Sequence, residues 1–377
     1  MWTQTREVAL PPSSGALPWR MPSARCLING VPMLGLTDAE VIATNTYAAG
    51  RFVVTAALGA DPVLTNEFWA ASGGILADLQ FSLDGQSFTS LIQGMVDSLA
   101  IDPLSGTVRL EGRDLTAALI ETRTQETFSN RTASEIATIL AERHGLTPAV
   151  TTTSTPVGRY YQNEHDRITL DQFSHATTEW DLLVFLARQE GFGVFVQGTT
   201  LYFQPPAPGQ TPAMQVAPTD LMDLHLRRSL TLARDIEVTV KSWNSRQRSA
   251  FTQTARASGQ QVSGAQAGPA TPPQRYVLVR PNLTPNQALQ LAQNRLAELT
   301  QHERVIDLLL PGELTLTPRS RLLLTGTGTG FDQTYYIDMI EREVHLASGF
   351  TQRVRAKNTS PRTETTTPAD TVGSVTG

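Results

Sequence analysis

The sequence predicts a mainly β fold with an α+β insert, in which two antiparallel β-barrel domains flank a small α/β module. Short β-type runs, punctuated by Gly, Pro and Asn, fill the first and last parts of the chain. Helical signals with capping residues lie between them. The chain has 377 residues, more than one typical domain contains, so several domains are expected.

The chain opens with an irregular, Pro-rich arm that covers residues 1–22. Trp2 and Trp19 lie in this arm without a periodic apolar pattern around them. They either pack back onto the domain that follows or dock onto a neighbouring subunit. We name Trp2 and Trp19 as the candidate partner-binding residues.

The first predicted β-barrel domain spans residues 23–115. Its strand-like runs follow one another closely, and residues 107–111 alternate an apolar face with a charged face. The turn 102–106 separates that run from the strand-like residues 88–101. About 90 residues of successive short strands are typical of a closed or nearly closed antiparallel barrel.

The α/β module is predicted at residues 116–218. A capping box at Thr132 begins one helix, and a second capping box at Thr169 begins a helical stretch that ends near residue 190. A compact hairpin follows. Five prolines between residues 205 and 218 mark the end of the module.

The second predicted β-barrel domain spans residues 219–357 and contains a helix at 285–302, which Thr284 caps. Further strand-like runs surround this helix, and residues 313–317 form one of them. Residues 358–377 are rich in Thr and lack apolar residues for a core. We therefore expect a disordered tail that is dispensable for folding.

Charge and cysteine content narrow the functional classes. The formal net charge is −5 and no basic tract is present, so specific nucleic-acid binding is not expected. Cys26 is the single cysteine, which excludes an internal disulfide and a four-cysteine metal site, and we expect it to be a buried apolar side chain. We expect no targeting segment and no membrane span, and therefore folding in the cytoplasm.

The best catalytic candidates are acidic residues and histidines that lie close together in the sequence: His165, Asp166, Asp171, His175, Glu179 and Asp181. On a helix, Asp171, His175 and Glu179 share one face and form either a metal site or an acid–base set. The same spacing is typical of a solvated helix face. We expect that structural role, with no metal and no cofactor.

Three further patterns have weaker chemical meaning. Glu121, Glu126 and Glu135 contain the residue types of a glycosidase pair, but no lysozyme-like helical context groups them. Residues 326–330 are Gly-rich but lack the Lys and helix of a phosphate-binding loop, so we expect a hairpin connection. Scattered basic residues are expected at a solvated rim or a subunit interface, with DNA contact as the alternative: Arg227, Arg228, Arg234, Arg246, Arg248, Arg353, Arg355 and Lys357.

The order of several short motifs along the chain resembles a known family. The motifs are a block that ends in Gly112-Arg113-Asp114, the stretch Thr124-Gln-Glu126-Thr-Phe128, the turn His144-Gly145-Leu146, a Trp-Asp-Leu-Leu block at 179–203, and a strand pair at 336–351. This order resembles the phage tail baseplate hub proteins of the late-control D-like, Mu-type family. That family is similar to the base of type VI secretion spike proteins. The resemblance covers residues 24–357.

The resemblance implies a structural protein and not an enzyme, and no catalytic residues carry over. It implies a homotrimer, whose six β-barrel domains form a pseudo-sixfold ring between the hexameric tail tube and the trimeric central spike. DNA would pass through this ring. The implied partners are the tail tube protein, the central spike protein, other baseplate proteins and the tape-measure protein. The implied location is the virion tail baseplate, after assembly in the host cytoplasm.

Three alternatives to the phage hub stay open from the sequence. One is another interaction module, such as a tube or distal tail adaptor. A second is a tail-associated peptidoglycan hydrolase that uses Glu121 or Glu126. The third is the hub of a phage-like injection machine.

Overall fold

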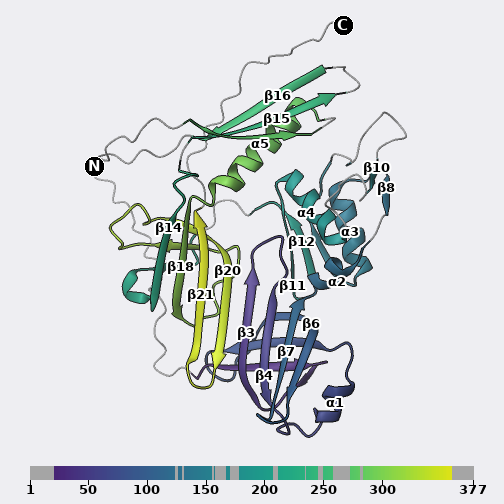
Figure 1. The fold of residues 1–377 in the computed structure, drawn as a ribbon, viewed down its shortest axis with the longest axis vertical. Coiled ribbons are helices and arrows are strands. Elements are labelled where there is room, and N and C mark those ends of the chain that lie inside the picture. The colour runs from purple at the N-terminus through teal and green to yellow at the C-terminus, as the bar shows by residue number, and fades with distance from the viewer. Residues whose placement is uncertain are drawn as a thin grey trace, which may run out of the picture.

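The computed structural model describes residues 21–123, 126–129, 131–154, 157, 167–169, 178–206, 211–233, 235–244, 249–257, 272–280 and 283–358. Over these residues the structure is mostly antiparallel β, which confirms the predicted fold class. Figure 1 shows two β regions in the lower half of the view, an α/β module above the first, and a helix-backed sheet above the second.

The first β region is a strongly coiled antiparallel sheet. Its elements are β1 (Ser23–Ile28), β2 (Val31–Pro32), β3 (Leu36–Thr44), β4 (Arg51–Ala57), α1 (Asn66–Ala71), β5 (Leu76–Ser82), β6 (Thr89–Asp102) and β7 (Thr107–Asp114). The strand order is β3-β4-β7-β6-β5-β1-β2, and β1 also contacts β3, so the barrel is nearly closed. Every second side chain points into one core, where Phe52, Leu79, Phe81 and Leu110 are almost completely buried.

The second β region is built from strands near the end of the chain. Its elements are β13 (Met214–Val216), η2 (Pro218–Asp220), β14 (Asp223–Arg228), β18 (Arg304–Pro311), β19 (Arg321–Leu324), β20 (Thr334–His345) and β21 (Gly349–Asn358). The strand order is β14-β18-β21-β20, and β19 pairs with both β20 and β13. Leu308, Leu322, Tyr335 and Ile337 fill its core.

A direct strand pair joins the two β regions. β20 pairs antiparallel with β3, and His345 lies opposite Asp38 at one end of the ladder. As a result, thirteen strands in the described part of the chain form one continuous sheet. Val344 and Phe350 of the second region pack into the first core, where the Phe350 and Phe81 rings meet edge to face with centroids 5.4 Å apart.

The α/β module packs two helices on a three-stranded sheet, with further short elements beside them. Its elements are α2 (Thr116–Glu121), β8 (Thr127–Ser129), α3 (Ala133–Arg143), β9 (Thr147–Val150), β10 (Arg167–Thr169), α4 (Glu179–Glu190), β11 (Gly193–Gln197) and β12 (Thr200–Gln204). Ile136, Leu140, Leu183 and Leu186 are completely buried between the helices and strands.

One predicted helix start in this module is confirmed and the other is wrong. The capping box at Thr132 is present, with reciprocal hydrogen bonds to Glu135. The helical stretch predicted from Thr169 to residue 190 is not continuous, because Thr178 has an extended backbone (φ −120°, ψ 161°) and bridges to Arg123. Thr169 itself is the last residue of β10, and residues 170–177 lie outside the described residues. α4 begins instead at a capping box between Thr178 and Asp181.

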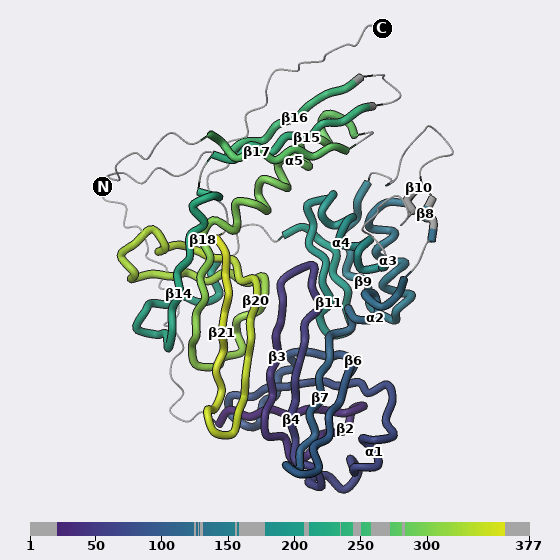
Figure 2. Tube along the Cα trace, viewed as in Figure 1, coloured from purple at the N-terminus to yellow at the C-terminus, as the bar shows by residue number. Residues whose placement is uncertain are grey.

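Residues 236–300 form a separate unit within the predicted second barrel domain. It contains β15 (Ile236–Asn244), β16 (Ser249–Ala257), β17 (Gln274–Val279) and α5 (Pro285–Thr300). β15 pairs with both other strands, and α5 covers one face of the sheet, where Val238, Val240, Ala292 and Leu296 are fully buried. Figure 2 shows this unit at the top of the view, away from the strands of the second β region.

The predicted strand at residues 313–317 is absent. This segment is a turn, because the Glu313 carboxylate accepts hydrogen bonds from the amides of Thr315 at 2.8 Å and Leu316 at 2.9 Å. The turn lets the chain cross the end of the second β region between β18 and β19.

The predicted tail begins too early. Asn358 is the last residue of β21, is buried, and donates a hydrogen bond to the Thr300 carbonyl at 3.1 Å. Residues 359–377, and the arm residues Trp2 and Trp19, lie outside the described residues. No helix in the described part of the chain is long and apolar enough to cross a membrane.

Candidate functional site

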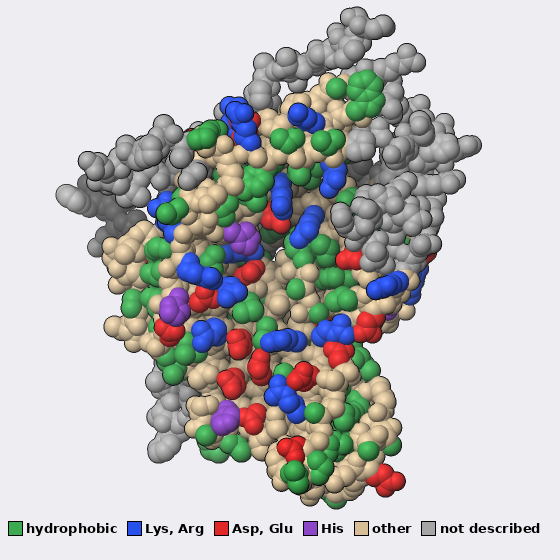
Figure 3. Space-filling model, in the orientation of Figure 1, with side chains coloured by type: hydrophobic (Ala, Val, Ile, Leu, Met, Phe, Trp, Pro, Cys, Tyr) green, Lys and Arg blue, Asp and Glu red, His purple; other side chains and the backbone are tan. Residues whose placement is uncertain are grey.

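The outer face of the continuous sheet carries a row of charged side chains. In an antiparallel ladder, directly opposed residues point to the same face, so the register aligns these charges from strand to strand. We call the row the charged face; it comprises His225, Arg227, Asp307, Arg353, Arg355, Glu341, Glu343, Glu40, Arg51, Arg109, Glu111, Arg113 and Asp97. Figure 3 shows it as a band of basic and acidic side chains across the middle of the molecule.

The basic end of the charged face is centred on Asp307. Its carboxylate accepts from Arg227 of β14 at 2.9 Å and from Arg355 of β21 at 2.8 Å, so one carboxylate bridges three neighbouring strands. These residues, with His225 and Arg353, line an open cavity of about 290 Å³. Because three guanidinium groups surround one carboxylate, this end carries a net positive charge.

The middle of the charged face is acidic. Glu343 lies opposite Glu40 across the join between the two β regions, and Glu341 lies on the same side of β20. Burial and the two neighbouring carboxylates raise the pKa of Glu40 above its usual range, although Arg51 at 3.9 Å opposes this. The join therefore places like charges side by side.

The far end of the charged face is balanced by ion pairs. Arg113 donates to Asp97 through two hydrogen bonds, at 2.6 and 2.9 Å, and it also pairs with Glu121. Arg109 pairs with Glu111 on the same strand at 2.8 Å. The charged face thus has a basic end, an acidic middle and an ion-paired far end, and no extended basic tract forms on it.

Arg319 contacts both the α/β module and the loop that follows β3, next to the join between the two β regions. It donates to the Asn45 carbonyl at 2.8 Å and to the Gln197 side chain at 3.1 Å, and its guanidinium lies 3.6 Å from the centre of the Phe195 ring. The backbone φ of Arg319 is 81°, which a residue other than glycine rarely adopts. Burial lowers the pKa of Arg319 to about 10, so it remains a cation at neutral pH.

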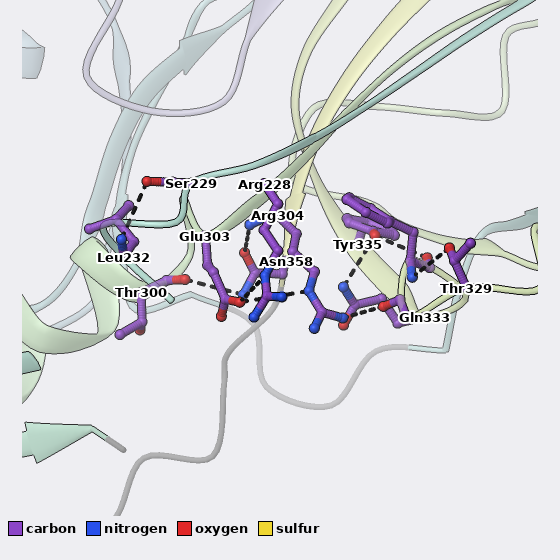
Figure 4. A network of polar contacts seen from close by, with 12 residues as sticks. Arg228, Ser229, Leu232, Thr300, Glu303, Arg304, Thr329, Gln333, Tyr335 and Asn358 are labelled. Atoms are coloured by element: carbon purple, nitrogen blue, oxygen red, sulfur yellow. Dashed lines mark hydrogen bonds and ion pairs between the residues drawn. The ribbon is translucent and has the colours of Figure 1, made fainter. Parts of the chain in front are cut away.

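A polar network connects the helix-backed unit to the second β region. Figure 4 shows it at the end of α5, where Glu303 accepts from Arg228 at 3.0 Å and Asn358 bonds to both Thr300 and Arg304. The Glu303 side chain is buried, so its charge is compensated by these cations and not by water. The network holds residues 236–300 against the sheet.

The catalytic candidates fall partly outside the described residues. His165, Asp166, Asp171 and His175 lie outside them. Glu179 is fully buried and pairs with Arg143 and with His144 at 2.6 Å, and Asp181 caps α4. In the described part of the chain, no group of three or more acidic, His or Cys residues is placed to hold a metal.

The three glutamates of the predicted glycosidase pair do not come together as a pair. Glu121 contacts Arg113 of the charged face, Glu126 contacts Arg143 at 2.6 Å, and Glu135 completes the Thr132 capping box. The Gly-rich residues 326–330 form an exposed turn that Asp332 organises by accepting from backbone amides, as a connection between strands requires.

Cys26 is completely buried and burial raises its pKa to about 12, as expected for an apolar packing role. Among the predicted basic residues, Arg227, Arg353 and Arg355 lie on the charged face, whereas Arg234, Arg246 and Arg248 lie outside the described residues. Sequence reasoning missed the carboxylates that face these arginines. Glu341 and Glu343 recur at every second residue, a spacing that places both on one face of a strand.

A family profile decides the classification of the sequence. The profile of the Alg8 N-terminal domain matches residues 86–345. The chain belongs to the Alg8 N-terminal domain family. No curated protein matches the sequence.

Solved structures confirm the predicted likeness to tail proteins at the level of the fold. A tail protein of Neisseria meningitidis MC58 is 14% identical, with a TM-score of 0.67 over 89% of this chain and 96% of that one. The 43 kDa tail protein of prophage MuSo2 from Shewanella oneidensis is 14% identical, with a TM-score of 0.63 over 90% and 99%.

A type VI secretion protein shares the same fold. This E. coli component is 14% identical, with a TM-score of 0.52 over 91% of this chain and 79% of that one, and is described as similar to the T4 tail proteins gp27 and gp5. The fold of this family member is therefore that of tail proteins and of a type VI secretion component.

Proposed function

We propose that this chain is the structural hub of a phage tail baseplate, where three copies form a ring that joins the hexameric tail tube to the trimeric central spike. The continuous sheet is the observation that carries the proposal, because β20 and β3 fuse two β regions within each chain. Three chains then contribute six β regions, one for each subunit of a hexameric ring. The same three chains keep the threefold symmetry that a trimeric spike requires.

The charged face suits the wall of a channel through which DNA passes. Asp307 pairs with two arginines and Asp97 with one, and Glu343 and Glu40 occupy the middle of the face, so it lacks an extended basic tract that would hold phosphates. The formal net charge of −5 adds a weak repulsion. We propose that DNA moves along this face without specific binding.

The proposal assigns the chain no catalytic step, metal or cofactor. The described catalytic candidates support this, since Glu179, Glu126 and Glu121 are each paired with arginines of the fold. Further proposed partners are other baseplate proteins and the tape-measure protein, with Trp2 and Trp19 of the arm at a subunit contact. The proposed location is the virion tail, after assembly in the host cytoplasm.

We also propose residues 23–115, 116–218 and 219–357 as the domains of the hub. The separate cores of the first β region, the α/β module and the second β region support this division. The helix-backed unit, with its own core, is then a subdivision of the third domain.

A second candidate is the hub of a phage-like injection machine. The fold shared with the E. coli type VI secretion component favours it. The two candidates differ in cargo, so purified particles that contain this chain distinguish them: packaged DNA supports the phage hub, and particles without DNA support the injection machine.

The test is reconstitution with the tube and spike proteins encoded beside this chain. Electron cryomicroscopy of the mixture should show three copies between one tube ring and one spike, with the charged face toward the channel. Six copies on a tube ring, or a charged face turned outward, would contradict the proposal.

A further inference from the structure

Two hairpin tips of the sheet are built in the same way. The β6–β7 tip reads Asp102-Pro-Leu104-Ser-Gly106, and the β20–β21 tip reads His345-Leu346-Ala-Ser-Gly349. In both, the first side chain accepts hydrogen bonds from the backbone amides two and three residues later. Asp102 accepts at 2.9 and 3.0 Å, and His345 accepts at 3.0 and 3.3 Å.

Both tips also end in the same way. Gly106 has a φ of 66° and Gly349 a φ of 78°, in the left-handed region that glycine adopts readily. Between the polar acceptor and the glycine, each tip holds one leucine in solvent: Leu104 is 100% exposed and Leu346 is 79% exposed. A single exposed leucine is ordinary, but the same construction in both β regions is a repeated feature.

The strand register places the two tips at the same edge of the sheet. Thr107 of β7 lies opposite Ala57 of β4, and Ala56 lies opposite Leu36 at the start of β3. His345 of β20 lies opposite Asp38, near the same end of β3. The strand order β21-β20-β3-β4-β7-β6 thus separates the two tips by four strand spacings, about 19 Å.

A third loop, next to the β6–β7 tip, carries further exposed aliphatic groups. Asp61 accepts from the amides of Val63 at 2.9 Å and Leu34 at 3.2 Å, and both side chains are more than half exposed. The Leu58 amide donates to the Gly106 carbonyl at 2.8 Å, which ties this loop to the β6–β7 tip. Polar side chains thus hold the loops in shape while the aliphatic groups face solvent, so binding there would need little further ordering.

The charges at this edge have one sign. The segments 29–36, 57–67, 102–107 and 345–350 contain no Lys or Arg, whereas Asp61, Glu67 and Asp102 lie within them. Backbone amides lower the pKa of Asp61, and the Ser105 hydroxyl together with backbone amides lowers the pKa of Asp102, so these carboxylates stay ionised at neutral pH. Figure 3 shows hydrophobic and acidic side chains without basic ones at the lower end of the molecule.

We propose that the two hairpin tips form a paired docking surface, on which Leu104 and Leu346 enter two equivalent apolar pockets bordered by Lys or Arg on an assembly partner. Two similar tips in each chain fit a partner ring with twice as many subunits as the hub. This inference rests on the proposed function, under which that partner is the tail tube ring. The opposite edge of the sheet is occupied by the α/β module of the chain itself, through contacts such as the hydrogen bond from the Tyr47 amide to the Val194 carbonyl at 3.1 Å.

The test measures binding of the full-length chain to the immobilised tail tube protein encoded beside it. The variant L104S/L346S should bind at least about tenfold more weakly for each leucine removed, as expected when a buried leucine contact is lost. D102N keeps an acceptor at the tip but removes a charge, so its binding should depend less on salt. V277S/V279S is the matched control, because it removes two exposed valines from β17 and should bind like the wild type.

The outcomes separate the inference from the proposed function. If the wild type binds the tube protein and L104S/L346S binds equally well, the inference is overturned and the hub proposal stands. If the wild type does not bind the tube protein, both are overturned. If L104S/L346S loses self-association in light scattering instead, the tips belong to an interface between copies of this chain, which also overturns the inference. Both leucines are exposed, so thermal melts should be unchanged in the variants.

Discussion

The two β regions share one sheet but differ in what fills their interiors. The first core is apolar, with Phe52, Leu79 and Phe81 at its centre. The second region also buries charged groups: Arg342 is 3% exposed and Glu313 is 6% exposed. The stability of the first region therefore depends on apolar contact area, and that of the second depends also on the pairing of buried polar groups. Truncation of an apolar side chain and removal of a buried charge should distinguish the two regions.

Truncation of Phe350 should have the largest effect on stability. Phe350 lies on β21 of the second region, but its side chain packs in the core of the first. F350A removes the edge-to-face contact with Phe81 and leaves a cavity where the regions meet. We expect a loss of about 4 kcal/mol in the free energy of unfolding, measured by urea denaturation. A loss below about 1 kcal/mol would show that the regions are not coupled through this side chain.

Removal of Arg342 tests the polar interior of the second region. R342M leaves the carbonyls of Glu313 and Leu316, which Arg342 contacts at 3.0 and 2.5 Å, without their donor. We expect a loss of about 3 kcal/mol in chemical denaturation, because a broken buried polar contact leaves its partners unpaired. The control R109M removes an exposed cation and should change stability by less than about 1 kcal/mol. Equal losses in the two variants would contradict the comparison.

Asp114 should make the edge of the first region sensitive to pH. Burial raises the pKa of Asp114 to about 6, although it accepts from the Gly50 amide at 2.6 Å. Because the folded pKa lies above the ordinary value of 3.8, the stabilisation is present below pH 3.8 and is lost as the pH rises through about 6. Between pH 4 and pH 7, the wild type should lose on the order of 2 kcal/mol relative to D114N. Parallel stability profiles for the two proteins would show that Asp114 has an ordinary pKa.

Removal of residues 359–377 should have the smallest effect on stability. The deletion must spare Asn358, because this residue bonds to Thr300 and Arg304. We expect a melting temperature within about 1 °C of the full chain, since the removed segment contains too few apolar residues to add to a core. Deletion of Asn358 as well should lower the melting temperature, and a large drop from the shorter deletion would show that the tail packs on the fold.

Local patterns in the sequence predicted the elements that depend on local interactions. The alternation at residues 107–111 predicted β7, and the Thr132 capping box predicted the start of α3. The pairing of β20 with β3 was not predictable, because residues about 300 apart in sequence carry no local signal for each other's register.

Competition between local signals explains the errors. Thr169 and Thr178 both begin sequences that fit a capping box, and the extended backbone of Thr178, which bridges to Arg123, places the start of α4 at Thr178. Alternation in β15 predicts a strand but does not reveal which sheet the strand joins, so the separate sheet of β15, β16 and β17 was not predictable. The spacing of Glu341 and Glu343 predicts that both lie on one face of a strand. That Glu40 of β3 lies opposite Glu343 depends on tertiary structure and was not predictable.

The mass of the purified chain in solution tests the central claim most directly. Light scattering at several concentrations, alone and with the tube and spike proteins encoded beside this chain, reports the number of copies. The hub account predicts three copies, or three times 41.0 kDa for the chain itself. A single copy at every concentration, both alone and in the presence of those proteins, would contradict it.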